Sequence, residues 1–237
     1  MAFRSGIFRL LGAMGFCVSL MGGAAKAGDT VVIELYTSQG CSSCPPADAI
    51  LSKLSQKPDV IALALHVDYW DYIGWADSFA RPEHTKRQRA YAHKAGQRTI
   101  YTPQMVIGGI DHVVGARPMD VYEILNRQKA TPAPVKLKAT RDGEEIVIQA
   151  NPVTEDVGLM VVQLVRYEPA ATVDIKSGEN AGQTITYANI VLDWQRLGEW
   201  SGDGPLTIKA LAPGKAPAVV ILQRPGPGAI VAATRVD

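Results

Sequence analysis

Cys41 and Cys44 are the two residues of this chain whose types and spacing point most directly to chemistry. Two thiols three residues apart on the first turn of a helix can close a small disulfide, and the positive end of the helix favours a thiolate at the leading cysteine. In dithiol chemistry one thiolate attacks a disulfide sulfur and the second thiol resolves the mixed disulfide. The sequence therefore predicts thiol–disulfide exchange, with Cys41 as nucleophile and Cys44 as resolving thiol.

The segments around the pair predict how it is positioned. Residues 31–36 are apolar and predict a buried strand, and a helix is expected from about residue 43 to residue 54. The polar run 37–40 joins the two and leaves Cys41 at the helix start, where we expect it to be reachable from solvent. The predicted site thus lies where a strand gives way to a helix.

Three other uses of a CxxC pair remain open from the residues alone. A zinc site would need two more ligands, but after residue 27 there is no further cysteine, and four histidines occur at no familiar ligand spacing: His66, His84, His93 and His112. A structural disulfide is typical of exported proteins, and it would make the protein a binding module instead of an enzyme. Copper(I) prefers soft ligands, so the two thiolates with Met105 or a histidine would suit a copper carrier.

The N-terminal segment indicates export. Arg4 and Arg9 precede an apolar stretch from Leu10 to about Gly23, and the small residues up to Ala27 fit a cleavage site. This stretch is too short and too rich in glycine to favour a membrane-spanning helix, although an uncleaved anchor is the alternative. We expect residues 1–27 to be a signal peptide and the mature protein to be periplasmic or secreted, with no membrane contact after cleavage.

The charge balance excludes one class of partner. The chain has 24 basic and 23 acidic residues, a formal net charge of +1, and no basic stripe, so no nucleic-acid partner is expected. Thiol exchange requires neither an organic cofactor nor a metal. The expected partner is a client protein with a thiol or disulfide, or a small thiol; oxidant, reductant and isomerase would use the same residues.

The two halves of the chain differ in pattern. Strands alternate with helices over residues 28–130, which predicts an α/β domain with an aromatic and helical insertion at residues 68–101. Residues 131–134 contain two prolines and indicate a linker. Short alternating segments over residues 135–237 predict an all-β, sandwich-like domain. The expected elements include helices at 82–95 and 118–128, and separate strands at 159–167, 172–176 and 184–192.

The residues around the cysteines resemble the thioredoxin superfamily, particularly its glutaredoxin-like members. Those proteins have a strand of the type Glu-aliphatic-Tyr-Thr before CxxC, as in Glu34-Leu35-Tyr36-Thr37 here, and Thr-x-Pro-Gln or a similar sequence before an apolar strand, as in Thr102-Pro103-Gln104. The resemblance implies a thioredoxin-like fold with a mixed sheet flanked by helices. It also implies a cis peptide bond at Pro103, the placement of Pro103 against Cys41, and substrate binding at Thr102 and Gln104.

A longer resemblance is to a family of exported bacterial proteins catalogued as thioredoxin-like and of unknown function. It covers residues 40–48, 66–71, 101–104 and 178–182, which belong to both halves of the chain. It implies a fold and a site, but no substrate.

Glu34 is a further catalytic candidate because it interrupts an apolar strand seven residues before Cys41. A buried carboxylate near the thiols would relay a proton during exchange, which would place Glu34 with Cys41, Cys44 and Pro103 in the catalytic site. Strand alternation offers the opposite expectation, in which Glu34 points to a solvated edge.

Tyr69 and Trp70 follow the second strand and are candidates for the wall of a substrate groove beside the cysteines. The alternative is that these aromatic side chains pack the insertion onto the sheet, because aromatic residues dominate core burial.

Overall fold

The computed structural model describes Met1 and residues 30–237, so the expected signal peptide and its cleavage site near Ala27 lie, Met1 apart, outside the described residues. Eight strands form a large sheet in the order β11-β10-β7-β8-β2-β1-β3-β4: β1 (Val31–Thr37), β2 (Val60–His66), β3 (Gln104–Ile107), β4 (Asp111–Val114), β7 (Met160–Asp174), β8 (Thr184–Trp200), β10 (Ala218–Gln223) and β11 (Ile230–Arg235). Around this sheet lie helices α1 (Pro45–Ser55), α2 (Pro82–Lys94), α3 (Pro118–Lys129) and the short 3₁₀ helix η1 (Asp71–Ile73).

The centre of the sheet is the parallel pair β1 and β2, in which every residue is buried. Strands β3 and β4 add antiparallel partners beyond β1. Both faces of the central pair are covered, which explains why these strands are apolar almost throughout instead of alternating. A parallel sheet of this kind brings the carboxyl ends of β1 and β2 to the same edge.

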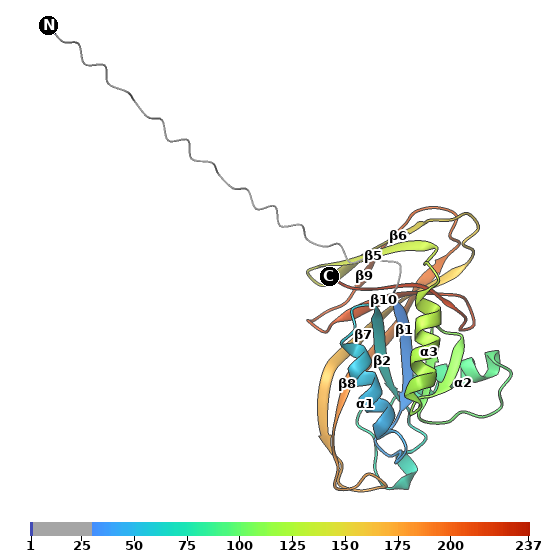
Figure 1. Ribbon diagram of the computed structural model, residues 1–237, viewed down its shortest axis with the longest axis vertical. Helices are drawn as coiled ribbons and strands as arrows, with labels where there is room; N and C mark the ends of the chain where they lie inside the picture. Colours follow the sequence, from blue (N-terminus) through green and yellow to red (C-terminus); the bar gives the residue numbers. More distant parts are fainter. Residues whose placement is uncertain (2–29) are drawn as a thin grey trace.

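Helices cover both faces of the sheet: α1 and α3 lie on one face, in front of β1 and β2 in Figure 1, and α2 packs on the other. Leu51 of α1 and Val121 of α3 pack in the same core, whereas Tyr91 of α2 packs in the core of the other face. The helices α1, α2 and α3 each begin with a proline, where the missing amide donor has no intrahelical partner. The predicted helices are confirmed to within two residues at each end. Among the described helices, none is long and apolar enough to cross a membrane.

The smaller sheet packs on the second half of the large one. It consists of β5 (Val135–Asp142), β6 (Glu145–Pro152) and β9 (Leu206–Leu211) in the order β5-β6-β9. Alternate residues of β5 and β6, such as Leu137 and Ile148, face a core shared with Val162 of β7 and Val220 of β10. The alternating pattern of the second half therefore builds a two-sheet core, as a sandwich requires.

The expectation of several short strands between residues 159 and 192 is wrong. β7 continues from Met160 to Asp174 and β8 from Thr184 to Trp200, and the two pair along almost their whole length. A proline such as Pro169 normally interrupts a strand, because it cannot donate a backbone hydrogen bond. Here β10 pairs with β7 only up to Arg166, so no described strand on that side requires an amide from residue 169. Beyond that point one edge of β7 has no partner among the described strands, and a proline is tolerated there.

The two halves of the chain are joined in one sheet. β8 pairs with β2 through Ala64 and Ile190, and the Asn189 side chain donates a hydrogen bond to the Ala62 carbonyl at 2.8 Å. The α/β class is confirmed, with a separate antiparallel sheet. However, the strands after the predicted linker extend the sheet of the first half, so the second half does not pack as an independent sandwich; the boundary at 131–134 stays a prediction.

Candidate active site around the Cys41–Cys44 disulfide

The predicted disulfide between Cys41 and Cys44 is present, with the two Cα atoms 5.4 Å apart. Cys44 is the N-cap residue of α1, and the segment from Thr37 to Cys41 leaves the carboxyl end of β1. The Cys41 residue is only 2% exposed and Cys44 is fully buried. The expectation that Cys41 is reachable from solvent is therefore wrong for this oxidised form, and other parts of the chain must cover it.

Pro103 has the cis peptide bond that the resemblance implied. It immediately precedes β3, and Gln104 at the start of β3 pairs with Tyr36 near the end of β1. Pro103 is buried, and its carbonyl accepts a hydrogen bond from the Gly115 amide at 3.0 Å. The cis-proline loop and the cysteine loop thus leave neighbouring strands at the same end of the sheet.

Trp70 joins these two loops. Its indole Nε1 donates a hydrogen bond to Thr102 Oγ1 at 2.7 Å, and a Cβ atom added to Gly40 would lie 3.3 Å from Trp70 Cβ and 3.2 Å from Ile73 Cδ1. The aromatic segment after β2 therefore packs against the residue that precedes Cys41. It is part of the cover over the disulfide.

Tyr69 and Gln104, the other two predicted substrate-binding residues, are connected through Gln88 of α2. The Tyr69 hydroxyl donates to Gln88 Oε1 at 3.2 Å, and Gln88 Nε2 donates to Gln104 Oε1 at 2.9 Å. Burial raises the pKa of Tyr69 to about 12. Tyr69, Trp70, Thr102 and Gln104 thus lie near one another, and their polar groups have partners within the protein. Their role in substrate binding stays a prediction.

Glu34 does not belong to this site. Its carboxylate is fully buried and accepts hydrogen bonds from Arg87 Nε at 2.6 Å, from the Tyr91 hydroxyl at 2.6 Å and from the Tyr36 hydroxyl at 3.0 Å. Burial, with the adjacent Glu34 charge, raises the pKa of both tyrosines. The expectation that Glu34 points to a solvated edge is wrong, because its side chain is buried. Its contacts with Arg87 and Tyr91 of α2 place it on the face of the sheet opposite α1, away from the helix that follows the cysteines. The prediction that Glu34 relays a proton to the thiols is corrected accordingly.

A different buried carboxylate lies beside the cysteines. Asp48 is one helical turn after Cys44 on α1, is 5% exposed, and accepts a hydrogen bond from Thr37 Oγ1 at 3.2 Å. Its Oδ1 atom has no hydrogen-bond partner among the described residues. Burial raises the pKa of Asp48 to about 7, although His66 acts in the opposite direction.

His66 and Asp77 continue this cluster at the carboxyl end of β2. His66 Nδ1 is 2.7 Å from Asp77 Oδ2, both side chains are fully buried, and His66 Nε2 has no hydrogen-bond partner in the described chain. Burial raises the pKa of Asp77, but hydrogen bonds from His66 and the Gln39 amide lower it below its usual value. Thr37 and His66 are paired residues on β1 and β2, so Asp48 and the His66–Asp77 pair lie at one edge of the sheet.

The sequence contains a signal for Asp48. Ala47, Leu51 and Leu54 form the buried stripe of α1, and Asp48 falls within that stripe four residues after Cys44. A carboxylate at a core position of the helix that carries the cysteines predicts a perturbed acid. Asp77 and His66 have no comparable signal, because their contact joins a strand end to a loop.

The tip of the β7–β8 hairpin is the remaining part of the cover. Asn180 is 1% exposed, and its Nδ2 donates to the carbonyl oxygens of Gln39 at 2.9 Å and Cys41 at 3.0 Å. Glu179 Oε2 accepts a hydrogen bond from the Ser42 amide at 3.3 Å. In Figure 1 the long β7–β8 ribbon runs down beside α1 to the end of the molecule where this tip lies.

A family model described as "Protein of unknown function (DUF1223)" matches residues 32–223, a range that includes Cys41, Pro103 and Asn180. The chain belongs to the DUF1223 family. Protein AGR_C_4864 from Agrobacterium tumefaciens, known from a crystal structure, is 37% identical to this chain in sequence. The match covers 90% of this chain and 95% of that protein, with a TM-score of 0.77. HBP35 of Porphyromonas gingivalis is 18% identical over 90% of this chain and 76% of its own, with a TM-score of 0.63, and shares the fold alone. No curated protein matches the sequence.

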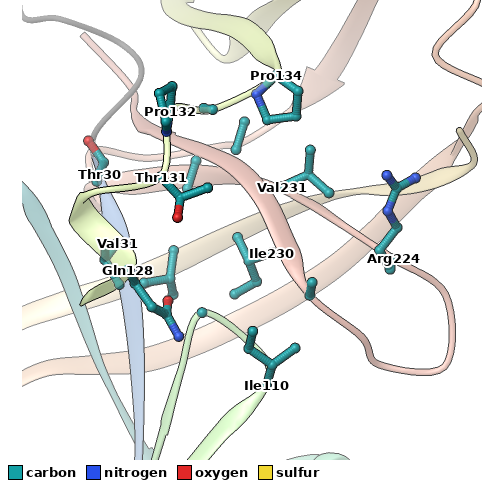
Figure 2. A pocket seen from close by; sticks show the side chains of 16 residues that line it. Thr30, Val31, Ile110, Gln128, Thr131, Pro132, Pro134, Arg224, Ile230 and Val231 are labelled. Carbon is teal, nitrogen blue, oxygen red and sulfur yellow. The ribbon is translucent and has the colours of Figure 1, made fainter. Parts of the chain in front are cut away.

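A cavity of about 310 Å³ in the DUF1223 protein lies at the opposite end of β1 from the disulfide. Figure 2 shows its lining, in which Val31 and Ile230 face the segment around Pro132, with Gln128 and Arg224 at its sides. Because β1 separates this cavity from the cysteine loop, it takes no part in the cysteine site.

Metal binding draws no support from the side-chain arrangement. No group of three or more His, Cys, Asp or Glu residues that would hold a metal occurs within residues 30–237. Met105, the ligand considered for copper(I), is fully buried in the core beneath α1 and α3. The zinc and copper hypotheses therefore depend on reduced cysteines alone.

Proposed function

We propose that this protein is a thiol–disulfide oxidoreductase with a thioredoxin-like site, in which Cys41 is the nucleophile and Cys44 the resolving thiol. The observation that carries the proposal is the disulfide at the start of α1, on the same sheet edge as the loop that ends in cis-Pro103. The expected substrate is a client protein with a thiol or disulfide, or a small thiol.

The arrangement of the first half supports a thioredoxin-like assignment. Parallel strands β1 and β2 with antiparallel β3 and β4 give the order β2-β1-β3-β4, with α1 and α3 on one face and α2 on the other. This order resembles the sheet of the superfamily that the CxxC and Thr102-Pro103-Gln104 motifs indicate. The strands β7 to β11 would then be additions to that sheet.

The proposed reaction proceeds in two exchanges. In the reducing direction, the Cys41 thiolate attacks one sulfur of the client disulfide, a Cys41–client disulfide forms, and the other client sulfur leaves as a thiolate. Cys44 then loses its proton and attacks the Cys41 sulfur, which re-forms the Cys41–Cys44 disulfide and releases the second client thiolate. The client gains two electrons and the protein loses two; the reverse sequence oxidises a client dithiol.

Asp48 is the group best suited to take the Cys44 proton. A thiol buried at the helix start has no direct access to water, and a carboxylate whose pKa lies near 7 both accepts and returns a proton at neutral pH. Asp48 lies on the same side of α1, one turn away, with one oxygen free of partners among the described residues. Glu34, with its oxygens bonded to Arg87 and two tyrosines, has no such freedom.

The proposed location is the periplasm or the extracellular space, because the sequence of residues 1–27 has the features of a signal peptide. An oxidising compartment would also preserve the disulfide between uses. Fractionation of cells that express the full chain, with N-terminal sequencing of the mature product, tests this: recovery of a cytoplasmic protein that retains Met1 would contradict it.

The burial of both cysteines favours a second candidate, a structural disulfide in a non-enzymatic binding module. The reduction potential of the pair separates the two functions. A value above about −270 mV supports exchange, whereas a value below about −300 mV indicates a structural bridge.

A trapping experiment tests the activity directly. A Cys44→Ser variant cannot resolve the mixed disulfide, so adducts between Cys41 and its clients accumulate and are recovered under non-reducing conditions. The Cys41→Ser variant is the matched control and should yield none. Equal recovery from the two variants, or recovery from neither, counts against exchange.

A further inference from the structure

The β7–β8 hairpin connects the second half of the chain to the cysteine loop. Near its tip the two strands pair, among the strands of residues 30–237, only with each other, because β10 pairs with β7 up to Arg166 and β8 pairs with β2 at Ile190. The turn is closed by hydrogen bonds from the Gly182 amide to the Ile175 carbonyl at 2.8 Å and from the Ile175 amide to the Gln183 carbonyl at 2.9 Å. It is a two-stranded arm that is anchored by side chains, because Tyr187 of β8 is buried with its ring 4.8 Å from that of His66 and 6.0 Å from that of Phe79.

The contacts of the tip are concentrated on the main chain around Cys41. Asn180 bonds the carbonyls of Gln39 and Cys41, and Glu179 bonds the amide of Ser42. Asn180 is itself held by Gln183, whose Nε2 donates to Asn180 Oδ1 at 3.1 Å. The tip thus occupies polar groups on both sides of the nucleophile, from a position 139 residues further along the chain.

The tip also closes against the aromatic segment. Ser177 Oγ donates to the Gly74 carbonyl at 2.6 Å, and a Cβ atom added to Gly178 would lie 3.2 Å from Trp75 Cβ. The η1 segment and the hairpin therefore meet beside the disulfide and leave Cys41 2% exposed. A thiol has to approach a sulfur atom directly to exchange with it, so this cover must move first.

We propose that residues 177–182 are a cap that determines which thiols react with the Cys41–Cys44 disulfide, and that Asn180 is the residue that holds it closed. This inference rests on the proposed exchange function. A small thiol makes too few contacts to displace the cap, whereas an extended polypeptide offers amide donors and carbonyl acceptors that replace those of Asn180 and Glu179. The cap therefore makes the site selective for polypeptide thiols.

The test compares the rates at which two probes reduce the disulfide: glutathione, and a reduced, unfolded polypeptide that contains two cysteines. For Asn180→Ala we expect the glutathione rate to rise about tenfold, as for a local opening held by two hydrogen bonds. The polypeptide rate is measured at saturating concentration, where the bound chain has already displaced the cap, and should change by less than about twofold. Thr186→Ala, which removes the Thr172–Thr186 hydrogen bond further along the same hairpin, is the matched control and should leave both rates unchanged.

Asn180→Ala leaves two carbonyls without this donor, so thermal unfolding is recorded for each variant. Glu179→Ala is a second variant at an exposed position and should raise the glutathione rate about twofold, because it removes one weaker bond. Unchanged glutathione rates in both variants overturn the cap, and a slower rate in Asn180→Ala would make Asn180 a positioning residue that favours exchange.

The reduction potential, measured on the same samples, separates this proposal from the proposed function. A cap that acts only on access changes the forward and reverse rates equally and leaves the potential unaltered. If no client adducts form with Cys44→Ser but Asn180→Ala is reduced faster, the cap is correct and the exchange function fails. If adducts form and the probe rates do not change, exchange stands and the cap fails.

Discussion

The buried carboxylates of Glu34 and Asp48 lie on opposite faces of the sheet at β1 and β2. They differ in the number of hydrogen bonds that each accepts. Arg87, Tyr91 and Tyr36 bond both oxygens of Glu34, and the Arg87 guanidinium stacks 3.8 Å from the centre of the Trp194 ring. Asp48 has one hydrogen bond, from Thr37, and a second oxygen without a partner among the described residues. Both carboxylates are buried, so burial alone does not indicate which of them is suited to transfer a proton.

The difference indicates how each carboxylate contributes to the protein. A buried carboxylate with a matched cation and several hydrogen-bond donors fixes the packing of α2 on the sheet. A buried carboxylate with few donors is held partly protonated at neutral pH, which makes it able to transfer a proton but costly to the folded state. Under the proposed exchange function, the comparison favours a stabilising role for Glu34 and proton transfer for Asp48.

The largest expected effect is on the Glu34 side. Arg87→Met removes the cation and leaves a buried carboxylate unpaired, so we expect a loss of about 3–5 kcal/mol in the free energy of unfolding, measured by urea denaturation. Arg89→Met is the matched control, because Arg89 is exposed on the same helix and should change stability by less than about 0.5 kcal/mol. Exchange by the folded fraction should remain within a factor of two; a large loss of exchange at unchanged stability would reverse the assignment.

The second prediction concerns the loss of folding stability that the buried, ionised Asp48 carboxylate causes at high pH. Its pKa is raised from 3.8 to about 7 in the folded protein, so its contribution is most favourable below pH 4 and is lost as the pH rises towards 7. We expect Asp48→Asn to be more stable than the wild type by about 2–4 kcal/mol at pH 8, and the difference to vanish below pH 4. A variant less stable than the wild type at pH 8 would contradict the raised pKa.

Because His84 also titrates, the test compares the stability of Asp48→Asn with that of the wild type at each pH. The pH dependence of wild-type stability alone would contain the contributions of both groups. Burial lowers the pKa of His84 to about 4, so its contribution is lost as the pH falls and acts against that of Asp48 in the same range. Both proteins contain His84, so its contribution cancels in the comparison.

The sequence predicts the part of the site that local patterns determine. The apolar strand, the proline-opened helix and the spacing of Cys41 and Cys44 are contiguous, and they give the strand–helix junction and the disulfide. The cis bond at Pro103 is implied by the resemblance of Thr102-Pro103-Gln104 to a thioredoxin-superfamily motif. Each of these features depends on residues that are contiguous in the sequence, so periodicity and motif are sufficient to predict it.

The parts that the sequence does not predict depend on contacts between distant segments. Glu34 meets an arginine 53 residues further along, and Asn180 meets Cys41 across 139 residues. The burial of Cys41 follows from the second contact, which requires β7 and β8 to continue as one arm past Pro169. No local pattern specifies the length of that arm, because pairing between the two strands overrides the sequence break.

The third prediction tests proton transfer at the thiols. Asp48→Asn should slow the release of a client from a preformed Cys41 mixed disulfide about tenfold or more at pH 7, since the Cys44 proton loses its acceptor. In the wild type this rate should fall as the pH is lowered through about 7, as Asp48 becomes protonated. Glu34→Gln is the comparison variant, and its folded fraction should retain the wild-type rate and pH profile; a matching loss in Glu34→Gln would remove the distinction between the two carboxylates.

The smallest effect is expected from the single donor to Asp48. Thr37→Val keeps the side-chain shape but removes the hydrogen bond that favours the ionised carboxylate, so the Asp48 pKa should rise further by less than about one unit, with a stability change of about 0.5–1.5 kcal/mol. The pH dependence of the carboxyl signal in infrared or NMR spectra reports this shift. Thr85→Val removes a similar Thr–Asp bond, to Asp68, and should leave the Asp48 pKa unchanged. A downward shift in Thr37→Val would mean that the hydroxyl stabilises the protonated acid, and it would contradict this prediction.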